Sequence, residues 1–161
     1  MTSQGAEALP RAVAWLGYGG LLPFVALAGV SLISQFSGQA SAQTVLVWHA
    51  ALITYGAVIL SFVGALHWSF AMTLPDLTVH QRTASFVWSI VPALVAWIAL
   101  LVAPVAGTAL LLAGFAAHYW RDRKLAAHAG LPAWYLPMRW RLTGVACLCL
   151  LLAVLPQMLR D

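Results

Sequence analysis

His67 is the residue whose surroundings most suggest chemistry. It lies near the end of the apolar run 44–72, which contains no Asp, Glu, Lys or Arg. Because lipid does not solvate an ionisable group, we expect the imidazole to face the helix bundle or a water-filled cavity. Small residues spaced by four (Ala57, Ser61 and Ala65) would let a neighbouring helix approach closely beside it. Two hypotheses remain open: a functional histidine, or a structural hydrogen bond between helices.

Aromatic and polar side chains are expected at the depth of His67, near the ends of other helices. Such a combination is typical of a small-molecule site, which has aromatic walls and a few polar groups. It is equally typical of the aromatic belt at a membrane interface, which is the commoner explanation. The candidate ligand-binding residues are Tyr18, His67, Trp68, Trp88, Ser89, Trp134, Tyr135 and Arg139.

The pair His67 and His118 is the one place where a metal or a haem iron is considered, because histidine nitrogen is a common ligand. Three neighbouring cations (Arg121, Arg123 and Lys124) would disfavour a bound metal ion. No further ligand is obvious either, since no cysteine lies at that level. We therefore predict no metal site, and the sequence defines no cofactor.

Motifs of conventional enzymes are absent from the chain. It contains no Gly-rich phosphate loop, HExxH, GxSxG or CxxC pattern. The predicted spans also lack the carboxylate that ion-coupled transporters and proton pumps usually place there. Cys147 and Cys149 lie on different faces of a helix and are expected to pack as small apolar residues. No catalytic residue is predicted, and an enzyme or pump is disfavoured.

Composition sets the solvent in which these side chains must be positioned. Of the 161 residues, 63% are hydrophobic and 7% are charged, whereas a soluble domain carries roughly 25% charged residues. So few charges cannot cover a water-facing surface. The chain is therefore predicted to be an all-α integral membrane protein with a single membrane domain over residues 1–161.

Five helices are predicted from runs of about 20 apolar residues, the length that a bilayer requires. The fourth is expected to continue through residues 121–127 as a water-facing extension. Residues 130–141, rich in proline, aromatic residues and arginine, are expected at the membrane interface. Pro23 and Pro92 are expected inside helices, where they remove backbone hydrogen bonds. The predicted helices are 15–33, 44–72, 84–102, 108–120 and 142–159.

The distribution of basic residues predicts the orientation. Positive residues near helix ends are retained in the cytoplasm, and seven of the eight fall on the side of the N-terminus. The prediction is therefore an N-terminus inside and a C-terminus outside, with no cleaved signal peptide. The basic residues are expected to meet anionic lipid headgroups rather than nucleic acid. They are Arg11, Arg82, Arg121, Arg123, Lys124, Arg139 and Arg141, against Arg160.

The first two predicted hairpins resemble each other. LLPFVALAGV is similar to IVPALVAWIA, and the second and fourth helices both end in a glycine followed by His and Trp. If the likeness reflects a duplication, His67 and His118 occupy equivalent helix ends at similar depth. The alternative is chance, since Ala, Leu and Gly dominate the chain.

Four segments together carry a resemblance to a known family. They are GYGGLLPF, YGAVILSFVGALHW, WSIVPALVAW and LPAWYLPMRWRLT. Over about 17–152 the chain resembles a bacterial inner-membrane family of unknown function that is related to a mitochondrial numbered transmembrane protein. The resemblance implies a bacterial inner membrane and transfers no catalytic residue. The helix number and tryptophan content are also similar, in general shape, to tryptophan-rich sensory (translocator) proteins.

Three functions remain in competition. The first is binding of a hydrophobic or planar ligand (a quinone, a tetrapyrrole or a lipid) at the cytoplasmic-side aromatic and histidine cluster. The second is an accessory or assembly subunit of a larger membrane complex, including self-association through the small-residue helix faces. The third and least favoured is an enzyme that acts on a lipid-soluble substrate through His67, because no acid partner for it is apparent.

Overall fold

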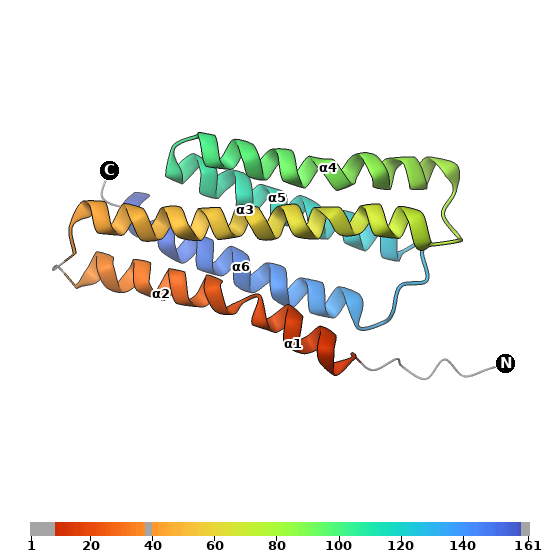
Figure 1. Cartoon of the computed structure of the whole chain (residues 1–161), viewed down its shortest axis with the longest axis horizontal. Helices are drawn as coiled ribbons and strands as arrows, with labels where there is room; N and C mark the ends of the chain where they lie inside the picture. Colours follow the sequence, from red (N-terminus) through yellow and green to blue (C-terminus); the bar gives the residue numbers. More distant parts are fainter. Residues whose placement is uncertain (1–8, 38–39, 159–161) are drawn as a thin grey trace.

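The computed structural model describes residues 9–37 and 40–158, and every regular element in these ranges is an α-helix. The helices lie side by side in an elongated bundle (Figure 1). Four segments (11–36, 42–73, 79–101 and 135–156) are long and apolar enough to cross a membrane. The predicted all-α membrane class is therefore confirmed. The helices are α1 (Arg11–Gly19), α2 (Leu22–Phe36), α3 (Ala42–Thr73), α4 (Val79–Leu101), α5 (Pro104–Ala126) and α6 (Tyr135–Met158).

The first predicted helix, 15–33, is in fact two helices separated by a turn at Gly20 and Leu21. Pro23 lies in the first turn of α2 rather than inside a continuous helix. A proline is tolerated there because the first-turn N–H groups have no intrahelical acceptor. The hydroxyl of Tyr55 on α3 donates to the carbonyl oxygen of Gly20 at 2.8 Å, which satisfies a backbone group at the break.

Three other helices begin four or more residues earlier than predicted, and the first turns of two of them explain why. Thr78 and Gln81 form a capping box that starts α4. Pro104 lies in the first turn of α5, where it costs little. The segment 130–141, predicted to be interfacial, already enters α6 at Tyr135. The predicted C-terminal limit of the last helix, residue 159, lies outside the described residues.

The apolar core is formed where α3 packs against its neighbours. Leu52 and Leu60 of α3, Leu111 of α5 and Leu150 of α6 are fully buried in one cluster. Glycine allows the closest approaches: a Cβ on Gly64 would lie 2.8 Å from the Pro92 ring of α4. At this point the backbone of α3 therefore packs directly against the proline ring of α4.

The two ends of the bundle differ in charge. The N-terminal side of α1, the α3–α4 connection and the α5–α6 connection lie together at one end (right in Figure 1). All seven described basic residues belong to helix turns at this end, which we call the basic end. One of them, Arg82, closes the C-terminus of α3 by donating to the carbonyl oxygens of Ala71 and Leu74.

Candidate functional site

A fully buried carboxylate, Asp122, is the centre of the most polar region inside the bundle. The side chain of Asp122 is 0% exposed. Its Oδ1 lies 3.0 Å from Nε2 of His67 and accepts a hydrogen bond from the Tyr135 hydroxyl at 3.2 Å. Its Oδ2 accepts from Nε of Arg139 at 2.8 Å. A buried carboxylate is costly unless it is paired and hydrogen-bonded, and these donors meet both requirements.

Three helices bring these side chains together near the basic end. His118 and Asp122 are one turn apart on α5 and therefore share a face. Tyr135 and Arg139 have the same spacing on α6, and His67 comes from α3. The rings of His67 and His118 lie 5.1 Å apart, edge to face. We call these five residues the Asp122 cluster.

Trp88 on α4 fixes the protonation of His118. Its indole Nε1 donates to Nδ1 of His118 at 3.1 Å. An indole N–H can only donate, so Nδ1 must hold a lone pair and His118 cannot be doubly protonated. Its single proton is then on Nε2, which lies 3.7 Å from Oδ1 of Asp122. This distance is too long for a hydrogen bond, so His118 lies between Trp88 and the buried carboxylate but is hydrogen-bonded to Trp88 and not to Asp122.

A metal ion does not fit the Asp122 cluster in this arrangement. His67, His118 and Asp122 do offer ligand atoms that lie within 4.8 Å of one another. A metal needs an imidazole lone pair, but the Nδ1 lone pair of His118 accepts the Trp88 proton and Nε2 carries hydrogen. Arg139 also neutralises Asp122 and brings a positive charge close to the three groups. The hydrogen-bond donors around Asp122 therefore stabilise its carboxylate rather than a bound cation.

Four of the eight candidate ligand-binding residues meet at this cluster. His67, Tyr135 and Arg139 contact Asp122 directly, and Trp88 contacts it through His118.

The other four candidate residues lie elsewhere. Trp68 is 49% exposed and packs its ring against Phe86. Ser89 is buried and donates to the carbonyl oxygen of Phe86. Trp134 is half-buried beside Tyr135, and the hydroxyl of Tyr18 accepts from Arg141 at 3.3 Å.

Asp122 was missed because it occurs in the sequence RDRK, which was expected to face water. The structure corrects this: α5 continues through the segment with Asp122 turned inward while Arg123 and Lys124 are exposed. The predicted span 108–120 does lack a carboxylate, but its continuation, predicted to face water, places Asp122 inside the bundle. The spacing of four from His118 is the one signal that could have indicated a shared buried face.

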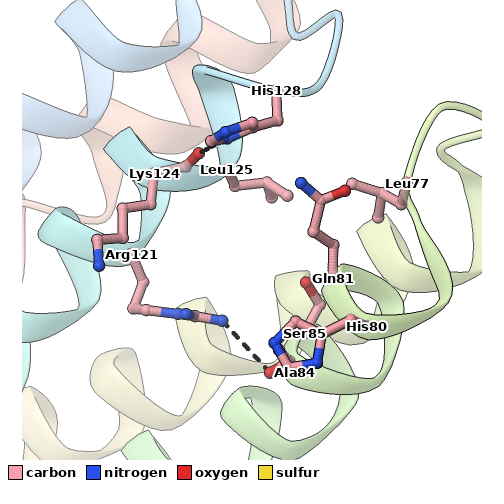
Figure 2. A pocket seen from close by; sticks show the side chains of 9 residues that line it. All are labelled: Leu77, His80, Gln81, Ala84, Ser85, Arg121, Lys124, Leu125 and His128. Carbon is pink, nitrogen blue, oxygen red and sulfur yellow. Dashed lines mark hydrogen bonds between the residues drawn. The ribbon is translucent and has the colours of Figure 1, made fainter.

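Two half-open cavities lie between α4 and α5. The first, which we call the basic cavity, has a volume of about 170 Å³. Figure 2 shows its wall, formed by α4, α5 and the turn that follows α5. The second, which we call the apolar cavity, has a volume of about 210 Å³ and is lined by Trp88, Pro92 and Gly114 with small and aliphatic neighbours. The polar residues of the basic cavity are His80, Gln81, Ser85, Arg121, Lys124 and His128.

Two side chains in contact separate these cavities. The guanidinium of Arg121, which lines the basic cavity, lies 5.3 Å from the ring centroid of Trp88, which lines the apolar cavity. This is a cation–π distance. His67 lines neither of these two cavities, and the ligand space expected around His67 itself stays a prediction.

A helical membrane bundle with a buried Asp–Arg pair at one end places the chain among polytopic membrane proteins. It belongs to the DUF3429 family of proteins of unknown function, which it matches over residues 9–155. It is similar to Transmembrane protein 69 of Xenopus tropicalis, with 33% identity over 141 residues, covering 85% of this chain and 51% of the relative. The predicted family resemblance is thus confirmed. The chain spans about half the length of this curated relative, and no solved structure matches it.

Proposed function

We propose that this multi-pass membrane protein binds a lipid-soluble ligand in the groove between α4 and α5. The observation that carries the proposal is the position of Trp88. Its ring is part of the apolar cavity, and its N–H is held by His118 of the Asp122 cluster. A buried network that fixes an aromatic wall is a way to keep a binding surface preorganised.

The size of the apolar cavity favours a chain over a large ring system. Ligand pockets usually measure roughly 300–1,000 Å³, whereas the apolar cavity has about 210 Å³. A tetrapyrrole would exceed this space, and His118 has no lone pair directed into it. An acyl or isoprenoid chain can lie in a half-open groove of this size against Ala113, Gly114 and Ala117.

Filling the apolar cavity tests this proposal. Ala113→Leu should weaken binding of a photoactivatable fatty acid by about tenfold, or about 1.4 kcal/mol, because its branched side chain occupies the groove. Ala109→Leu is the matched control, since it is exposed one turn earlier on α5 and lines neither cavity. The measurement is crosslinking of the purified protein followed by mass spectrometry. Equal labelling of both variants would contradict a site in this groove, and co-purifying subunits without lipid would favour the accessory role.

We also propose that the protein lies in a bacterial inner membrane with the basic end in the cytoplasm. Support comes from the seven basic residues gathered at that end, where the anionic leaflet would attract them. The exposed residues Asp76 and Ala127 belong to this end, and Ser41 and Ala103 to the other.

Cysteine labelling tests the orientation, with Cys147 and Cys149 first replaced by Ala. A cysteine at Ser41 or Ala103 should react with an impermeant maleimide in intact cells. A cysteine at Ala127 should react only after the membrane is opened, because the basic end is inside. Reaction at Ala127 in intact cells would reverse the orientation.

A further inference from the structure

The basic cavity has the electrostatics of an anion site. Two cationic side chains, Arg121 and Lys124, and two histidines, His80 and His128, line it, and no Asp or Glu does. Of the acidic residues that the structure describes, Asp76 is exposed outside the cavity lining and Asp122 is paired with Arg139. No carboxylate therefore neutralises the lining from within.

Arg121 is the side chain best placed to meet an anion. Its Nη2 donates to the carbonyl oxygen of Ala84 on α4 at 3.3 Å, which is a long hydrogen bond (Figure 2). Its Nε is buried without a hydrogen-bond partner among the described residues. A guanidinium has five N–H donors in a planar fork that suits phosphate and carboxylate oxygens, and only one of them has a hydrogen-bond acceptor among the described residues. Lys124 is less directed, because its ammonium lies 3.6 Å from the Trp120 ring centroid.

The start of α4 adds to the positive potential. His80 and Gln81 belong to the first turn of α4, where the helix dipole is positive and favours anions. This helix has 23 residues, so its dipole is fully developed. The cavity thus has two independent sources of attraction for negative charge. One is the N-terminus of α4, and the other is the guanidinium of Arg121.

We propose that the basic cavity binds the acidic headgroup of the ligand whose chain lies in the apolar cavity. The inference rests on the proposed function and names the ligand class: an anionic amphiphile with a phosphate or carboxylate head. Arg121 binds the oxygen atoms with its fork, and its guanidinium lies 5.3 Å from the centroid of the Trp88 ring, where the chain begins. The Asp122 cluster positions both residues indirectly, because His118 holds the Trp88 ring.

Lipid selectivity of the purified full-length chain tests the proposal. Delipidated protein is titrated in detergent with phosphatidylglycerol and phosphatidylcholine of identical acyl chains, and bound lipid is counted by native mass spectrometry. We expect wild type to prefer phosphatidylglycerol by about tenfold, or about 1.4 kcal/mol. Both lipids carry a phosphate, but the choline ammonium of phosphatidylcholine cancels its charge and would be repelled by the cationic lining. Arg121→Gln should abolish the preference while leaving phosphatidylcholine bound, which also shows that the variant is folded. Arg121→Lys should keep part of it, because charge remains without the planar fork.

Matched variants separate the possible outcomes. Arg123→Gln removes an exposed charge two residues further along α5 that lines neither cavity, so it should keep the preference. The headgroup site is contradicted if Arg121→Gln keeps the preference for phosphatidylglycerol, or if wild type has no such preference. In either case, weaker lipid binding in Ala113→Leu would still support the proposed function. If no lipid binds, both fail. Inorganic phosphate is titrated alone: Arg121-dependent binding that Ala113→Leu leaves unchanged would support the anion site and identify free phosphate as its source.

Discussion

Asp122→Asn is expected to lower the free energy of unfolding by about 3–5 kcal/mol, the range for breaking a buried ion pair by removing one partner. The substitution keeps the size of the side chain but leaves the Arg139 guanidinium buried without a counter-charge. It also turns an amide N–H₂ toward groups that donate, among them the Tyr135 hydroxyl. Thermal unfolding in detergent, followed by circular dichroism, measures the loss.

A compensating substitution separates the charge effect from a general defect. The double variant Asp122→Asn, Arg139→Met should recover much of the stability, because no unpaired charge stays buried. Asp76→Asn is the matched control: this carboxylate is exposed, and its loss should change stability by no more than about 0.5 kcal/mol. If Asp122→Asn unfolds like the control, the Asp122 cluster does not stabilise the bundle.

The membrane class and most helices could be predicted from the sequence because length and apolarity are read directly from residue types. The helix ends could not. The break at Gly20 depends on Pro23 starting a new helix, and a proline inside an apolar run also fits a kinked single helix. The likeness of the two hairpins would, if it reflects a duplication, place His67 and His118 at equivalent helix ends, and their rings lie 5.1 Å apart. The duplication itself stays a prediction.

The candidate site was predicted only in part because residue type does not reveal which face of a helix is buried. Trp68 and Trp88 were both expected at the same depth in the membrane, yet Trp68 is half-exposed while the indole N–H of Trp88 donates to His118. Asp122 lies between two arginines, so charge density indicates water although the helix turns this one residue inward. Only the contacts among α3, α4, α5 and α6 decide these cases, and such contacts are not local in the sequence.

Gly64→Ala should destabilise the bundle by about 1–3 kcal/mol, the usual cost of overpacking. The new methyl would lie 2.8 Å from Cβ and 2.9 Å from Cγ of Pro92, and a proline ring cannot rotate away, so α3 and α4 must separate. Gly144→Ala on α6 is the matched control. A Cβ there meets nothing within 4 Å, so it should stabilise by up to about 1 kcal/mol through helix propensity. Opposite signs in thermal unfolding are expected. If Gly64→Ala stabilises the protein, the α3–α4 contact at Pro92 is looser than described. If Gly64→Ala costs less stability when Pro92→Ala is also present, the double-mutant cycle assigns that cost to the Pro92 ring.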